Sequence, residues 1–150
     1  MSVYRPEERR LVLRLMAYWD DLRDTREYPR HDEIDPGTIG DDWPNCFLVA
    51  LREPADQSQL SYIGPNLVND GVPDGPVSVA ELPADALIAH ALSPLQRMLS
   101  KRIPMSIGGE AEIAGEAVLY RSILLPLSDD GRSIDHVLGA ANGKRADGDA

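Results

Sequence analysis

The run from Ile123 to Leu127, ILLPL, decides the fold of this 150-residue chain. Successive side chains of a strand point to opposite faces of a sheet, so this run places apolar side chains on both faces. A strand that is apolar on both faces belongs to a sheet that is covered on both faces. The rest of the chain is therefore expected to supply a layer for each side.

The segments beside this run predict the other strands of an antiparallel sheet. The run lies in a predicted strand over residues 115–128, a DDGR turn follows at 129–132, and residues 133–140 form the last strand. Three more strands are predicted earlier in the chain, at residues 46–53, 60–64 and 104–113. Five strands in two groups, with a helical block between them, indicate an antiparallel α+β domain.

A leading helix is predicted from Pro6 to about Arg23 or Thr25. Proline suits the first helical position because its missing N–H costs no hydrogen bond there, and the turn-rich residues from Pro29 onward end the pattern. The helix carries one apolar stripe at helical spacing, made of Leu11, Leu15, Tyr18, Trp19 and Leu22. Core packing is the expected role of this stripe.

A second helical block is predicted between the two groups of strands. Ser78 and Glu81 have capping-box spacing, so a helix is expected to start there. Helical periodicity then continues to Leu99, and Pro94 interrupts it with Ser93 placed to cap the second piece. The block is therefore expected to be a kinked helix or two short helices.

Composition excludes several classes of protein. The chain has 43% hydrophobic and 27% charged residues, as ordinary globular proteins do, and its length fits one domain. Its net charge of −10 argues against nucleic acid and against an anionic membrane surface as partners. A single cysteine, the lack of a secretory signal and the lack of an apolar run of ~20 residues predict a cytoplasmic protein.

The order of the predicted elements resembles that of a PAS domain, in which two strands, a helical crossover and three strands follow one another. Short motifs resemble the bacterial single-PAS family called PAS_5, and these are Tyr18-Trp19, Leu22-Arg23, Tyr28-Pro29, Ile34-Asp35-Pro36, Tyr62-Ile63-Gly64, Ile103-Pro104 and residues 123–140. The resemblance runs from about Leu11 to Ala141. Residues 65–78 depart from the family, because the segment that normally walls a ligand pocket is here poorer in apolar residues.

The resemblance implies a division of the chain and a role. Residues 1–36 are expected to form an N-terminal helix and an acidic connector. Residues 37–141 are expected to form the PAS core with a five-stranded antiparallel sheet, and residues 142–150, which have little to bury, a disordered tail. In this arrangement Tyr18 and Trp19 dock the leading helix on the sheet face that the crossover helices leave open.

The implied function is cytoplasmic sensory signalling through protein–protein contacts, with or without gating by a small ligand. The expected partners are a second copy of the chain, in a homodimer, and another protein such as a signalling kinase. The leading helix is expected at the homodimer interface, where Val12 and Met16 leave an apolar margin at the helix edge. Neither nucleic acid nor a membrane is expected to bind.

No catalytic, cofactor or metal residue is assigned from the sequence. Cys46 precedes or opens the first strand, whereas the flavin-binding cysteine of light-sensing PAS domains sits on the crossover helix, so a buried, inert thiol is expected. His90 lies on the crossover helix, where haem-binding PAS domains can carry a ligand, but it falls off the apolar stripe and is expected to be exposed. His31, His90 and His136 show no metal-ligand spacing, so we expect neither a metal nor a flavin or haem cofactor.

An alternative from another class is a small α+β enzyme, such as an isomerase or a hydrolase, with an acid–base pair in a pocket. Its nearest candidate pair, Asp135 with His136, is disfavoured because adjacent residues of a strand point to opposite faces. Catalytic carboxylates must converge across a pocket, which sequence neighbours rarely do. Turns or solvated faces are the expected place of the adjacent acids Asp20-Asp21, Asp41-Asp42 and Asp129-Asp130. We therefore expect no enzyme.

Overall fold

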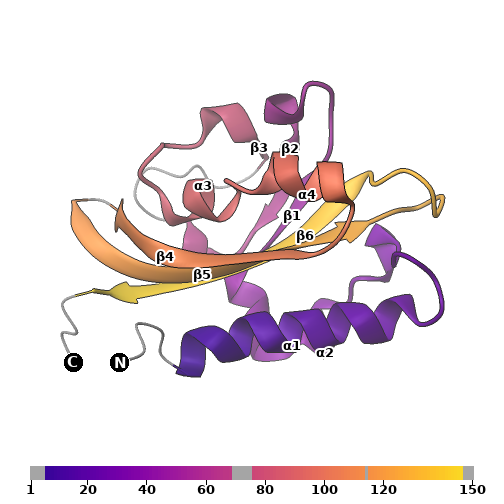
Figure 1. Ribbon diagram of the computed structural model, residues 1–150, viewed down its shortest axis with the longest axis horizontal. Helices are drawn as coiled ribbons and strands as arrows, with labels where there is room; N and C mark the ends of the chain where they lie inside the picture. The colour runs from indigo at the N-terminus through magenta and orange to yellow at the C-terminus, as the bar shows by residue number, and fades with distance from the viewer. Residues whose placement is uncertain (1–5, 69–75, 114, 147–150) are drawn as a thin grey trace.

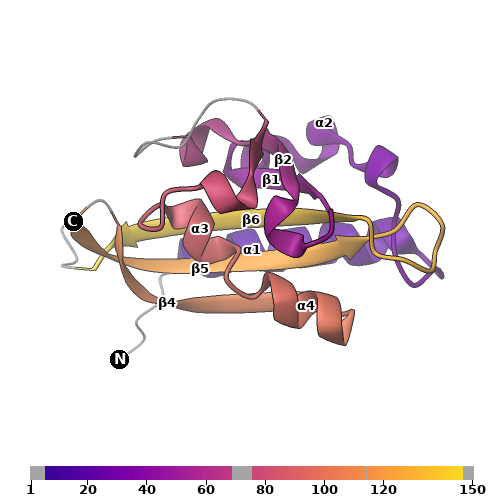
Figure 2. The same ribbon diagram turned by 90° about the horizontal axis from the view of Figure 1, so that it is seen from above.

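One antiparallel sheet separates two helical layers in the structure, a computed structural model that describes residues 6–68, 76–113 and 115–146. Helix α1 (Pro6–Arg23) lies along one face, and α3 (Leu87–Ala91) and α4 (Leu95–Lys101) lie over the opposite face (Figure 1). Seen from above, α3 and α4 lie in front of the sheet and α1 behind it (Figure 2). The α+β fold and the cover on both faces are as predicted.

The sheet has six strands in the order β3-β2-β1-β6-β5-β4, and every neighbouring pair is antiparallel. The strands are β1 (Cys46–Ala50), β2 (Gln59–Ile63), β3 (Val77–Ser78), β4 (Met105–Ile113), β5 (Glu116–Leu127) and β6 (His136–Arg145). The expected number was five. The additional edge strand, β3, consists of two residues that pair with β2, which is too short to leave an alternating pattern in the sequence.

Strand β5 is buried on both faces, as its apolar run predicted. Leu124 lies among the side chains under the crossover helices, whereas Ile123, Leu125 and Leu127 lie in a separate cluster under α1. Burying one such side chain fully contributes about 1.5–3 kcal/mol. The two faces of this one strand therefore hold the two helical layers to the sheet.

Helix α1 has the predicted start and end, and its apolar stripe faces β5 and β6. The indole N–H of Trp19 donates a hydrogen bond to the Pro126 carbonyl at 2.8 Å. Tyr18 is half-buried beside it, and its hydroxyl accepts the backbone N–H of Asp35 at 2.8 Å. The two aromatics thus fix the helix to the outer face of the sheet. Neither α1 nor any other described helix is long and apolar enough to cross a membrane.

The acidic connector folds into short helical turns, η1 (His31–Glu33), α2 (Pro36–Ile39) and η2 (Gly40–Asn45). Asp35 caps α2, because its carboxylate accepts the Gly37 N–H at 3.1 Å and the Thr38 hydroxyl at 2.6 Å. Since α2 begins at Pro36, the predicted boundary between connector and core, at residues 36 and 37, falls inside a helix.

The remaining connections are short turns of 3-10 helix, η3 (Ala55–Gln57), η4 (Pro65–Leu67) and η5 (Val79–Glu81). The predicted capping box is present at η5, where the Ser78 N–H donates to Glu81 Oε1 at 2.9 Å. The helix predicted to start there is only this three-residue turn, and the first α-helix of the block begins at Leu87. From Leu87 the block is divided into α3 and α4, as predicted. The residue that precedes α4 is Pro94 and not Ser93, and it makes no side-chain cap.

Residues 142–145, which were predicted to belong to a disordered tail, form the end of a strand. Strand β6 continues to Arg145, and residues 142–145 pair with Val118–Arg121 of β5. The prediction of disorder from residue 142 is wrong for this part, because backbone hydrogen bonds along β5 hold a segment that has few apolar side chains. Residues 147–150 lie outside the described residues.

Candidate functional site

The space between the sheet and the crossover helices, where the resemblance would place a ligand pocket, is filled with side chains. Phe47 of β1 is fully buried and pairs across the sheet with Gly139 of β6. A Cβ atom on Gly139 would lie 2.2 Å from Phe47 Cζ, so the ring rests directly on the glycine backbone. The helices cover the ring with further buried side chains, which are Ile88, Ala91, Leu92, Leu95 and Met98. The centre of this face is therefore a packed core.

Cys46 opens β1 and is fully buried under α1, as predicted. Its thiol donates a hydrogen bond to the Asp42 carbonyl at 3.3 Å. Burial and, to a smaller extent, the nearby Asp42 carboxylate raise the pKa of the thiol from 9.0 to about 12. A thiol in this environment stays protonated and unreactive at neutral pH.

Because of Cys46, the protein is expected to lose stability as the pH rises above about 9. The unfolded chain releases the thiol proton near pH 9, while the folded chain holds it until about pH 12. This difference in pKa corresponds to about 4 kcal/mol, present in full below pH 9 and lost between pH 9 and pH 12. Urea denaturation of the parent and of Cys46→Ala at pH 7.5 and pH 10.5 measures it. The parent should lose more stability than the variant, and equal losses would contradict the prediction.

His90 lies on α3 and is partly buried rather than exposed. Its ring lies 5.9 Å from the ring of Tyr120, centroid to centroid, in a tilted contact. The two rings are neighbours on the side of the sheet that carries the crossover helices. Among the contacts of the described residues, none joins His90 to either of the other two histidines.

The other two histidines lie face to face at one end of the sheet. The rings of His31, in η1, and His136, the first residue of β6, are stacked with centroids 3.8 Å apart and planes 8° apart. Nδ1 of His31 lies 2.9 and 3.0 Å from the two carboxylate oxygens of Asp129. Nδ1 of His136 lies 2.8 Å from Oδ1 of Asp135. We call these four residues the histidine–aspartate cluster.

Backbone contacts between the connector and the β5–β6 loop hold this cluster in place. The Ser128 N–H donates to the Pro29 carbonyl at 2.9 Å, and the Asp135 N–H donates to the Leu127 carbonyl at 3.0 Å. The Asp129 N–H donates to Asp135 Oδ2 at 2.9 Å, which joins the two halves of the cluster. Hydrogen bonding from His31 lowers the pKa of Asp129 below its ordinary value, so this carboxylate is ionised at neutral pH.

Two contacts at these residues do not follow from sequence spacing. The fold brings His31 to within hydrogen-bonding distance of Asp129, 98 residues away. It also joins Asp135 to His136, so the prediction that these two side chains point to opposite faces is wrong. Asp135 precedes β6, so strand alternation does not apply to it, and its side chain bonds to that of His136. No sequence signal identifies the contact between His31 and Asp129. The contact between Asp135 and His136 could have been predicted only from knowing that β6 starts at His136.

Several of the adjacent acids bond to basic side chains or to the backbone of the β5–β6 loop. Asp20 bonds to Arg23 at 2.7 Å, and Asp42 bonds to Arg14 at 2.6 Å. Asp130 shapes the β5–β6 loop, because one of its oxygens accepts the N–H groups of Arg132 and Ser133 at 2.8 and 2.9 Å. Asp130 is a turn residue, as predicted, whereas Asp42 is held in an ion pair and Asp129 bonds to His31.

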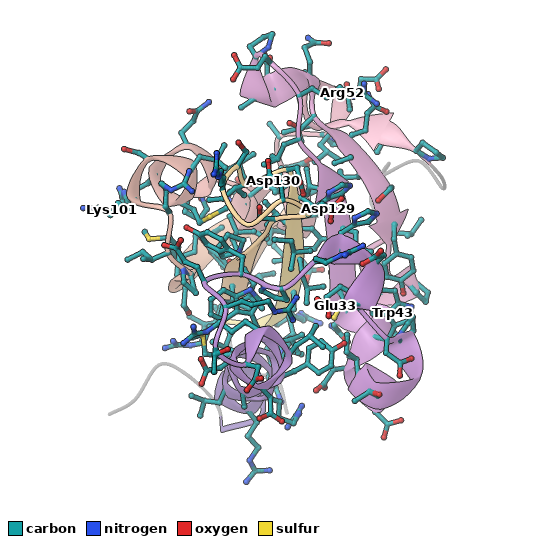
Figure 3. The ribbon with its side chains drawn as sticks, turned by 90° about the vertical axis from the view of Figure 1, so that its right-hand side faces the viewer. Glu33, Trp43, Arg52, Lys101, Asp129 and Asp130 are labelled. Atoms are coloured by element: carbon teal, nitrogen blue, oxygen red, sulfur yellow. The ribbon has the colours of Figure 1, made fainter. Side chains whose placement is uncertain are left out.

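An open cleft of about 730 Å³ lies beside the cluster. It is lined by residues 51–55 after β1, by Ser133, Ile134 and Asp135 of the β5–β6 loop, and by Gln96, Leu99, Ser100 and Arg102. Figure 3 looks onto this end of the molecule, with Arg52 at the top and Asp129 and Asp130 near the middle. Arg52 and Arg102 both line this cleft, and Asp135 lies at its edge.

The architecture is that of a PAS domain, an antiparallel sheet with a helical crossover on one face, here with a leading helix on the other. Residues 8–59, from α1 to the first residue of β2, match the PAS_5 family model, described as a PAS domain. The match covers these residues alone, and over them it agrees with the predicted resemblance.

Two solved structures are similar to this chain at low identity. One is a fungal LOV domain photoreceptor, with 12% identity, 91% of this chain and 90% of that chain covered, and a TM-score of 0.46. The other is an RNA-binding light-oxygen-voltage receptor, with 18% identity, 66% and 29% covered, and a TM-score of 0.39. No curated protein matches the chain.

Proposed function

We propose that this PAS domain signals through protein–protein contact, as a homodimer with α1 at the interface. The observation that supports the proposal most is Leu13, on the outer face of α1, whose side chain is 62% exposed. A single exposed leucine is ordinary on a monomer, but one on a helix that borders an uncovered part of the sheet favours a contact with another molecule.

The surface beside Leu13 consists of the flank of α1 that faces β4 and the exposed face of β4 next to it. Arg14 reaches Asp42 on one flank of the helix, and Met16, about 200° further round at 100° per residue, lies on the other flank. The neighbouring strand β4 exposes small or acidic side chains on the α1 side of the sheet, which are Ser106, Gly108, Glu110 and Glu112. A second copy of α1 would find an exposed strand face there, with no large apolar or aromatic side chain on it.

One part of the expected interface is corrected by burial. Val12 was expected to lie on an exposed apolar margin together with Met16, but it is only 7% exposed and belongs to the core under α1. Met16 is partly buried against the same core. Leu13 therefore replaces Val12 as the residue to test, since a charge at position 12 would unfold the helix from the sheet.

Sedimentation equilibrium of the parent, of Leu13→Glu and of Ile103→Glu tests the dimer. Ile103 is the matched control, because it is also a large exposed apolar side chain, 52% exposed, but lies between α4 and β4. We expect a dimeric parent, a monomeric Leu13→Glu and a dimeric Ile103→Glu. A parent that stays monomeric at high micromolar concentration contradicts the homodimer, and a Leu13→Glu that dimerises as the parent does contradicts the α1 interface.

Gating by a small ligand is assigned to the open cleft in this proposal. The packed centre around Phe47 and Gly139 supports this assignment, because it offers no space beneath the crossover helices. Arg52 and Arg102 favour an anionic compound. A protein partner such as a signalling kinase is the second possible recipient of the signal, and a monomeric parent would favour it over the homodimer.

The runner-up function is a small α+β enzyme, and the observation that favours it is the hydrogen bond between Asp135 and His136 at the edge of the cleft. Such a pair could act as a general base. Among the hydrogen bonds of the described residues, however, none joins a serine or cysteine side chain to either histidine of the cluster. Turnover of an ester or an isomerisable substrate that is lost in His136→Ala would replace the signalling proposal with this one.

A further inference from the structure

The histidine–aspartate cluster has the chemistry of a metal site. A carboxylate can only accept hydrogen bonds, so the Nδ1 atoms of His31 and His136 each carry the proton that they donate to Asp129 and Asp135. In the neutral form of each ring, Nε2 then holds a free lone pair. His136 has the arrangement typical of a metal-binding histidine, because such a histidine nearly always donates its other ring N–H to a carboxylate or a carbonyl outside the ligand set, here Asp135.

We propose that His31, His136 and Asp129 bind one divalent transition-metal ion of the Zn²⁺ type. One ligand atom from each of the three residues lies within 4.8 Å of the other two. Two imidazoles and a carboxylate suit Zn²⁺ and related ions, and water would complete the coordination. Asp135, which is hydrogen-bonded to His136, acts as a positioning residue that fixes the orientation of the ring.

Binding requires the two rings to leave their stack and Asp129 to release its hydrogen bond to His31 Nδ1, because a carboxylate held there cannot also reach an ion at Nε2 of the same ring. Parallel rings 3.8 Å apart direct their lone pairs along parallel planes, whereas ligand atoms of one tetrahedral ion lie about 3.3 Å apart and converge. The side chains have room to turn, because those of His31 and Asp129 are 42% and 40% exposed. An ion would therefore draw η1 and the start of β6 together from two different parts of the fold.

The charges around the cluster also favour a cation. The neighbouring acids are already neutralised or bonded locally, Asp32 by Arg30 at 2.7 Å and Glu33 by Arg26 at 2.9 Å. Among the described residues, the side chain of Asp129 pairs with the imidazole of His31, and the chain as a whole carries a charge of −10. The competing explanation is that the two histidine–aspartate pairs only hold the connector against the β5–β6 loop and bind no metal.

Calorimetric titration of the metal-stripped, untagged chain with Zn²⁺ distinguishes the two explanations. We expect one ion per chain, and a loss of at least about tenfold in affinity in each of His31→Phe and His136→Phe. Phenylalanine keeps a stacked ring but removes the ligand nitrogen, so these variants separate coordination from packing. His90→Phe is the control and should bind as the parent does.

Two further readouts accompany the titration. Co²⁺ bound in place of Zn²⁺ should give visible absorption that both cluster variants lose, and Zn²⁺ should raise the melting temperature of the parent but not of His136→Phe. Three results would overturn the proposal: no binding at millimolar Zn²⁺, binding that survives both cluster variants, or binding that His90→Phe abolishes. None of these results depends on whether the chain dimerises.

Discussion

Replacement of Trp19 by alanine is expected to lower the free energy of unfolding by about 3–5 kcal/mol. The side chain is 4% exposed and packs against Leu125 and Leu138 in the cluster under α1. Its indole N–H is also bonded to the Pro126 carbonyl at 2.8 Å, in the middle of the apolar run that decides the fold. Alanine removes the ring and leaves that carbonyl without its donor, so both losses add.

Urea denaturation followed by tryptophan fluorescence measures this loss, because the chain has two tryptophans and Trp43 still reports on folding. Trp19→Phe separates the loss of packing from the loss of the hydrogen bond. It keeps most of the packing and should cost about 1–3 kcal/mol, mainly through the lost hydrogen bond. Trp43→Ala is the control, since Trp43 is only partly buried and stacks on Tyr62 at 4.2 Å. Equal midpoints for the parent and Trp19→Ala would show that α1 is not docked on the sheet.

The fold could be predicted where the sequence carries a periodic signal. The ends of α1, the hairpins and the division of the crossover block all follow from local patterns of apolar residues, proline and glycine. What could not be predicted are elements held by backbone pairing alone. Strand β3 and residues 142–145 of β6 have no apolar periodicity, and only the neighbouring strands, β2 and β5, determine that they are extended.

The candidate site could be predicted even less, because it depends on contacts between distant segments. His31 follows the leading helix and Asp129 begins the β5–β6 loop, so their contact exists only when the connector wraps around the end of the sheet. The assignment of Cys46 as buried and inert was possible because it depends on one strand alone. His90 was predicted on the correct helix. Its contact with Tyr120 could not be predicted, because it depends on how that helix packs on the sheet.

Replacement of Phe47 by alanine should also cost about 3–5 kcal/mol, and it should open a cavity at the centre of the crossover face. The ring is fully buried, and Gly139 beside it offers no side chain that could fill the space. Small apolar molecules are therefore expected to raise the melting temperature of Phe47→Ala while leaving the parent unchanged. A parent that responds as strongly as the variant would show that the centre already holds a cavity.

The pairing of Phe47 with Gly139 can be tested by a double-mutant cycle. Gly139→Ala alone should cost about 1–3 kcal/mol, because its Cβ would lie 2.2 Å from the ring. In the Phe47→Ala background the same change should cost much less, since the ring that it collides with is gone. Gly109→Ala is the control, because the nearest atom to its Cβ, Tyr120 Cε1, is 4.0 Å away. If the two losses add in the double mutant, the ring does not rest on Gly139, and the centre of the domain has space for a ligand after all.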